Sequence, residues 1–142
     1  GGRPRDTTFL QAHKSLQHAL RFLAPGGKLL LFADCGEGLG SAMLARYAAD
    51  PPNFRPFAGG AEDPQTVLHI QTLIALRRAA RAADVGLCSR LPAPVAAALG
   101  LRPFGDREEA LAWLASGAGA WGWLPRAERF LPTSGWRGGC LA

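Results

Sequence analysis

Lys28-Leu29-Leu30-Leu31-Phe32-Ala33-Asp34 is a short apolar run without polar alternation that directly follows a Pro-Gly-Gly turn. Such a run is typical of a strand that is covered on both faces of a parallel sheet. The segment from Asp84 to Ser89 has the same character, and helical patterns lie between and around the two runs. Strands that alternate with helices predict a single α/β domain in three layers, with a mostly parallel, Rossmann-like sheet of three to four strands.

Helical periodicity and the positions of Gly and Pro predict the remaining elements. Asp63 followed by Pro64 is the usual order of an N-cap and a first helical residue, and Asp106 with Glu109 fits a capping box. Residues 51–60 hold too many prolines and glycines for regular structure, and the tail after Pro125 is predicted to be irregular. The expected helices cover residues 8–23, 41–49, 64–82, 92–99 and 107–115, with further brief strands at 101–104 and 120–124.

Composition limits the chain to one domain and few classes of partner. With 142 residues, 48% of them hydrophobic, the chain is large enough for one core and small for two. The net charge of +5 raises the question of an acidic partner or nucleic acid, but the only local cluster, Arg77, Arg78 and Arg81, fits the solvated face of a helix. Because no apolar run reaches the roughly 18 residues of a membrane span and no signal pattern opens the chain, a cytoplasmic protein is expected.

The cysteines and histidines do not form a pattern that holds a metal or a disulfide framework. Cys35, Cys88 and Cys140 are odd in number and widely spaced, without a CxxC pair. His13 and His18 are five residues apart, off the spacing that places two metal ligands on one helix face. No metal site is therefore predicted, and the histidines are expected at the surface or partly packed, with His13 opposite the apolar face of the first helix.

The turn Asp34-Cys35-Gly36-Glu37-Gly38-Leu39-Gly40 lies between the first strand and the second helix and has three interpretations. It can be a methyltransferase-like nucleotide turn, although Pro25-Gly26-Gly27 precedes the strand here instead of lying well downstream of the turn. It can be a tight turn that binds nothing. It can also line a cleft with Glu37 and the Cys35 thiol, which would be either a nucleophile beside a base or a buried structural thiol.

The opening stretch, from Gly1 to Lys14, reads as a loop that enters the N-terminus of a helix. Gln11 and Lys14 are three apart and therefore share one helix face in the first two turns. Beside the backbone N–H groups of a helix start, an amide and a cation make a cradle for a carboxylate or a sulfate. The alternative is that Gln11 is used in a capping box with Thr8 and that Lys14 is solvated.

Gly1-Gly2-x-Pro4-x-Asp6, Gln11-x-x-Lys14, Gly26-Gly27 before a hydrophobic strand, and Cys35-x-x-Gly38-x-Gly40 occur in this order. The combination resembles the C-terminal domain of the nickel-dependent lactate racemase family over about the first 45 positions. The resemblance implies a partner N-terminal domain that holds a nickel pincer nucleotide and two catalytic histidines. It also implies that hydride leaves C2 of a 2-hydroxy acid and returns to either face of the keto acid.

Residue by residue, the resemblance assigns binding of the substrate carboxylate to Gln11 and Lys14. Asp6, Leu10, Cys35, Glu37 and Gly38 are candidates for lining the same cleft, and no catalytic residue is expected in this chain. Leu10 stands where the family can show an aromatic residue, so the substrate side group can differ from that of lactate.

The resemblance thus predicts a substrate-binding and lid domain of a larger racemase or epimerase, catalytically silent alone. Its expected partners are the N-terminal domain and a small 2-hydroxy acid, with no membrane or nucleic acid. Two alternatives remain: a free-standing α/β ligand-binding or interaction module without chemistry, and an S-adenosylmethionine-dependent methyltransferase-like domain.

Overall fold

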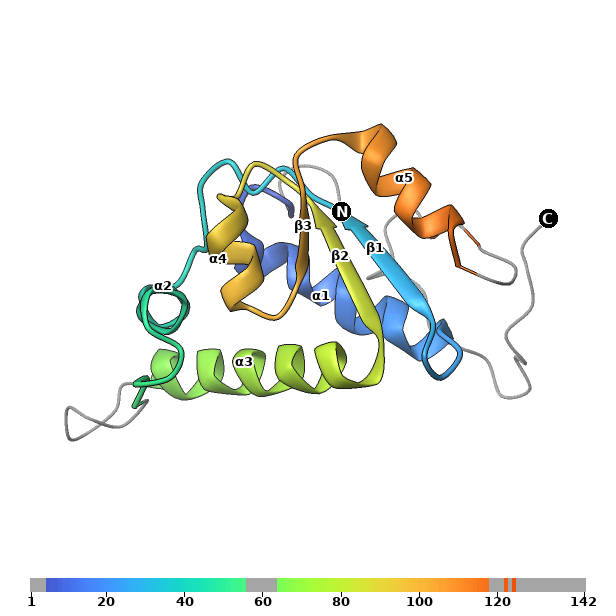
Figure 1. Ribbon diagram of the computed structural model, residues 1–142. Coiled ribbons are helices and arrows are strands. Elements are labelled where there is room, and N and C mark those ends of the chain that lie inside the picture. The colour runs from blue at the N-terminus through green and yellow to red at the C-terminus, as the bar shows by residue number, and fades with distance from the viewer. Residues whose placement is uncertain (1–4, 56–63, 118–121, 123, 125–142) are drawn as a thin grey trace.

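A computed structural model describes residues 5–55 and 64–117, together with residues 122 and 124. Three parallel strands form one sheet in the order β1-β2-β3, flanked by helices (Figure 1). The predicted mixed α/β fold with a parallel, Rossmann-like sheet is confirmed. The elements in chain order are α1 (Phe9–Ala19), a 3₁₀ turn η1 (Leu20–Phe22), β1 (Lys28–Phe32), α2 (Ala42–Ala49), α3 (Pro64–Ala82), β2 (Asp84–Cys88), α4 (Ala93–Ala98), β3 (Arg102–Phe104) and α5 (Arg107–Ala115).

Helices lie on both faces of the sheet. α1 and α3 pack on one face against β1 and β2, whereas α5 contacts all three strands from the other face (Figure 1). α4 packs beside β3, and α2 contacts both α3 and α4. The crossover from β1 to β2 runs through α2 and α3, which is the type of connection that a parallel pair requires.

The two sheet faces are covered unequally by the described residues. Along β1, Leu29 and Leu31 are buried, while Lys28, Leu30 and Phe32 are only half-buried. Leu29 and Leu31 face the core formed with α1 and α3. Lys28, Leu30 and Phe32 face α5. The strand was predicted correctly, and helices cover both faces of the sheet, although the single helix α5 spans three strands and leaves its face less buried.

Most predicted helix ends are confirmed. Ser41 caps α2 by accepting from the backbone N–H of Leu44 at 3.2 Å, and Asp106 caps α5 by accepting from that of Glu109 at 2.9 Å. The first helix ends in a 3₁₀ turn at Phe22, within a residue of its predicted end. The N-cap Asp63, residues 120, 121 and 123 of the candidate strand 120–124, and the tail after Pro125 lie outside the described residues.

His13 is buried, at 5% exposure, which corrects the expectation that it faces solvent. Its Nδ1 donates to the carbonyl of Leu10, and its Nε2 accepts from the Thr72 hydroxyl of α3 at 3.4 Å. The spacing of apolar residues in α1 predicts a single buried face, with His13 on the opposite side. Because α3 lies against a second side of α1, the position of His13 becomes internal.

We predict that the stability of the fold falls as the pH decreases below the ordinary histidine pKa of 6.5. Burial lowers the pKa of His13, and the nearby Lys14 and His69 lower it further, against the opposing effect of the Leu10 carbonyl. The unfolded chain therefore takes up this proton at a higher pH than the folded chain does. Stability is fully present above pH 6.5 and is lost as the pH falls through the lowered folded pKa.

Chemical denaturation between pH 5 and pH 8 measures this effect. His13→Gln should be less stable at pH 7.5 and should show a flatter dependence on pH over that range. His18→Gln, which removes another histidine of α1, is the matched control. An unchanged pH profile in His13→Gln would show that the buried imidazole is not the group responsible.

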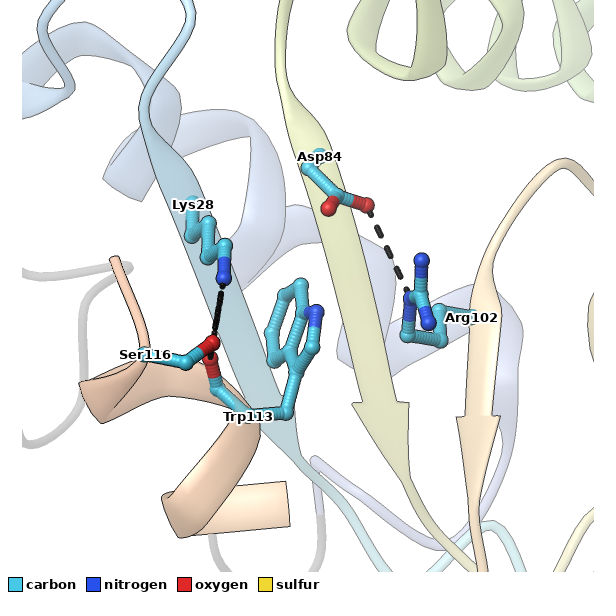
Figure 2. Close-up of polar contacts among 5 residues, drawn as sticks. All are labelled: Lys28, Asp84, Arg102, Trp113 and Ser116. Carbon is cyan, nitrogen blue, oxygen red and sulfur yellow. Dashed lines mark hydrogen bonds and ion pairs between the residues drawn. The ribbon is translucent and has the colours of Figure 1, made fainter. Parts of the chain in front are cut away.

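Trp113 attaches α5 to the sheet through a site that only glycine permits. A Cβ on Gly86 would lie 2.7 Å from Cζ3 of Trp113 and 2.8 Å from Cε2 of Phe104. The Lys28 ammonium and the Arg102 guanidinium lie 5.2 and 5.7 Å from the indole ring (Figure 2). Both distances suit cation–π attraction.

The Lys28 side chain also caps the C-terminus of α5. Its Nζ donates to the Trp113 carbonyl at 3.1 Å and to the Ser116 hydroxyl at 2.8 Å (Figure 2). A cation at a helix C-terminus is favoured by the helix dipole, so Lys28 links the first strand to the last helix. The ion pair between Arg102 and Asp84, at 3.9 Å and well exposed, contributes little by comparison.

Gly86→Ala is expected to destabilise the protein by about 1–3 kcal/mol, because the added methyl group forces Trp113 or Phe104 out of place. Gly105→Ala is the matched control, since a Cβ there meets nothing within 4 Å. The control should stay within about 0.5 kcal/mol of the parent protein in urea denaturation. Equal midpoints for the two variants would contradict the packing role of Gly86.

Candidate functional site

The segment before α1 is bonded along the turn that follows β1. Four backbone hydrogen bonds join residues 6–10 to residues 35–39: Cys35 N–H to the Asp6 carbonyl (2.7 Å), Glu37 N–H to the Thr7 carbonyl (2.9 Å), Phe9 N–H to the Gly38 carbonyl (2.9 Å) and Leu10 N–H to the Leu39 carbonyl (3.1 Å). The start of α1 is thereby held at the carboxyl edge of the sheet. In open α/β sheets this edge is where ligands gather.

The turn owes its path to unusual backbone angles at three positions. Gly38 and Gly40 have φ values of +79° and +67°, and Cys35 has the positive φ of 51° that a non-glycine residue rarely adopts. A Cβ on Gly40 would also lie 2.7 Å from the Cβ of Thr8. Gly40 therefore serves both the turn and the close approach of the segment that starts α1.

The helix start does not offer the backbone donors that the sequence suggested. The N–H groups of Phe9 and Leu10 donate to the turn, and those of Gln11 and Ala12 both donate to the Thr8 carbonyl. These are the amides that an anion at the N-terminus of α1 would need. The expectation of a cradle built on exposed backbone N–H groups is therefore wrong, and an anion here must rely on side chains.

A polar pocket of about 300 Å³ lies beside the first two turns of α1. It is lined by Arg5, Gln11, Lys14 and Ser15, and we call it the anion pocket. The Lys14 ammonium donates to the Oε1 of Gln11 at 2.8 Å, so the two exposed side chains converge. The predicted pairing of Gln11 and Lys14 on one face is confirmed.

The alternative use of Gln11 in a capping box is not seen. Thr8 is the N-cap of α1, but its side chain makes no capping hydrogen bond. The Gln11 side chain instead accepts from Lys14, and both residues line the same pocket. The capping-box interpretation of Gln11 is therefore not supported.

The other predicted cleft residues do not line the anion pocket. Cys35 is buried, and Leu10 packs against the core. Glu37 is exposed on the turn, and its backbone pairs with Thr7. Gly38 belongs to the hydrogen-bonded turn, while Asp6 is half-buried and its Oδ1 is an atom without a hydrogen-bond partner among the described residues.

Arg5 and Ser15 are pocket residues that reasoning from the sequence missed. Ser15 is four residues after Gln11 and so falls on the same helix face, a signal that was available from the spacing. Arg5 precedes the helix, and only the pairing of its neighbour Asp6 with Cys35 places it beside α1. Two cations and two neutral polar groups therefore line the pocket, a composition suited to an anion.

The arrangement around the turn does not support nucleophilic or nucleotide chemistry. Burial raises the pKa of Cys35 to about 11, with Asp34 and Asp6 adding to the shift. Three N–H groups of the turn, those of Cys35, Glu37 and Gly38, donate to backbone carbonyls. A turn that holds a nucleotide phosphate presents such amides to the ligand, so the structure favours a structural turn and a structural thiol.

Cys35 should accordingly resist alkylation. Iodoacetamide at pH 7.5 is expected to leave it unmodified in the folded protein, because the thiolate is the reactive form and is scarce far below a pKa of about 11. Mass spectrometry of tryptic peptides measures the labelling, and the urea-unfolded chain is the control in which Cys35 should react. Rapid labelling of the folded protein would restore the nucleophile interpretation.

The described residues offer no donor set for a metal. Within residues 5–55 and 64–117, no group of three or more His, Cys, Asp or Glu side chains is close enough to hold an ion. His69 bonds instead to the Ser41 hydroxyl at 2.9 Å.

The part of the chain that the structure describes also has no helix with both the length and the apolar character of a membrane span.

Comparison with known proteins leaves the family open. No family model matches this chain, and no curated protein is detectably similar to it in sequence.

Proposed function

We propose that this domain binds the carboxylate of a small organic acid in the anion pocket, as the substrate-binding C-terminal domain of a nickel-dependent 2-hydroxy acid racemase or epimerase. The observation that carries the proposal is the convergence of the Lys14 ammonium and the Gln11 amide, 2.8 Å apart, in a pocket that Arg5 also lines. The order of motifs described above supplies the reaction class.

The chemistry of the pocket suits recognition of a carboxylate. An incoming carboxylate takes up ammonium N–H donors of Lys14 and the NH₂ group of Gln11, and the Ser15 hydroxyl lies beside them. Two donors on adjacent turns of one helix fix the orientation of the acid as well as its position. Such a site positions a substrate and breaks no bond in it.

The hydride transfer is assigned to another part of the protein. The described residues provide neither a metal donor set nor a reactive thiol, so the nickel pincer nucleotide does not fit a site among them. No step of the proposal runs through that cofactor here. An N-terminal domain or subunit is proposed to hold it, with the anion pocket turned toward the reaction centre.

A free-standing binding or interaction module is the second candidate function. The apolar groove described in the next subsection favours it, because that groove lies on a different side of α1 from the anion pocket. The methyltransferase-like alternative has no support of this kind, since three amides of its candidate nucleotide turn donate within the chain.

Titration of the ¹⁵N-labelled protein with sodium lactate tests carboxylate binding. The amide signals of residues 11–15 should shift, with a dissociation constant on the order of 1 mM, as expected for a few exposed contacts. Lys14→Gln should weaken binding about tenfold or more, because a hydrogen bond to a charged group is lost. Gln11→Ala should also weaken it, by less.

Arg81→Gln is the matched control, since it removes one exposed cation from α3 and leaves the pocket intact. Its affinity for lactate should equal that of the parent protein. Sodium chloride at the same ionic strength corrects for general salt effects. Shifts that are equal in Lys14→Gln and in the parent protein would refute the proposed site.

A further inference from the structure

An apolar groove runs between α1 with its 3₁₀ extension and the C-terminal half of α3. Its volume is about 760 Å³, and it shares no lining residue with the anion pocket. Ile74 is 46% exposed within it although it is one of the large hydrophobic residues of the chain. The apolar side chains of its walls include Leu20, Leu23, Pro25, Ile74, Ala75 and Ala79.

The groove continues as an apolar stripe along α3. Val67 is 44% exposed and precedes Ile74 by seven residues, which places both on one helix face about 10 Å apart. Arg78 follows on the same face and lines the groove. A site bounded by two neighbouring helices, with an apolar stripe along one of them, is the shape that receives a third helix.

The walls of the groove carry positive charge only. Residues 9–27 and 64–83, which contain both walls, include no Asp or Glu. Arg78 lines the groove, and Arg21, Arg77 and Arg81 are further cations on the two helices or their ends, outside the lining. Of the three arginines that the sequence predicts on a solvated helix face, one therefore lines an apolar groove.

This charge distribution argues against occupants from the chain itself. A second copy docked by the same face would bring the arginines of α3 against each other. The segment 125–142 carries three arginines and one glutamate, so it is also basic. Charge complementarity favours an occupant that is acidic.

We propose that this groove binds an amphipathic helix of a partner protein, whose apolar face enters the groove and whose flanking Asp or Glu residues face Arg78 and its neighbours. The apolar side chains supply burial, and the carboxylates select the partner and its orientation. The proposal is independent of the proposed function, because Gln11 and Lys14 take no part in it.

Fluorescence anisotropy with the full chain tests the proposal. The probe is a labelled helical peptide of about 18 residues, with Leu at every third or fourth position and Glu at most others. Binding is expected to saturate, and to weaken as the salt concentration rises. Ile74→Asp and Arg78→Glu should each weaken it about tenfold or more.

Two variants serve as matched controls. Leu111→Asp places the same acid at an exposed apolar position of α5, and Arg46→Glu reverses an exposed charge on α2. Both should bind the peptide as the parent protein does, and circular dichroism confirms that all variants are folded. A second peptide has the same composition but its leucines are scrambled, so that they no longer share one helix face. The proposal would be overturned if this peptide bound as tightly as the amphipathic probe, or if the amphipathic probe did not bind at all.

Light scattering after size-exclusion chromatography tests whether a second copy of this chain occupies the groove instead. A dimer of the parent protein that Ile74→Asp converts to a monomer would show that the groove joins two copies, and would overturn the proposal. A monomer at all concentrations agrees with it.

Discussion

Four backbone hydrogen bonds between residues 6–10 and residues 35–39 position everything that this domain offers to a ligand. They join the segment before α1 to the turn after β1, so the first helix starts at the carboxyl edge of the sheet. They also use the amides that a helix start would otherwise present to an anion. The polar pocket beside α1 is therefore built from side chains, next to a helix start whose first four N–H groups already donate within the chain.

That frame depends on small residues at close approaches. Gly40 allows Thr8 to lie against the turn, and Gly86 allows Trp113 to lie against the sheet. In both places a side chain of ordinary size would separate two segments that are distant in the sequence. The first contact orders the site, and the second holds α5 over the face of the sheet opposite α1 and α3.

Helix α1 presents three different surfaces. Phe9, Ala12 and Leu16 face the core, Gln11 and Lys14 line the anion pocket, and Gln17 borders the groove with α3 together with Leu20 of η1. A small-molecule site and a protein-binding site can therefore coexist on one helix without sharing residues.

The amino-acid sequence by itself determined the order and type of the elements. Continuous apolar runs specified β1 and β2, and Gly, Pro and capping residues specified most helix ends, because these signals act over a few residues. The spacing of Gln11 and Lys14 likewise predicted their contact, since positions three apart on a helix must be neighbours.

Only the tertiary structure decided which surfaces meet. His13 is buried because α3 packs on a side of α1 that its own periodicity leaves polar, and Arg5 enters the pocket because Asp6 bonds to Cys35. The loss of the free amides at the start of α1 follows from the same pairing. These features depend on contacts between segments some 25 to 60 residues apart, for which a single sequence carries no local signal.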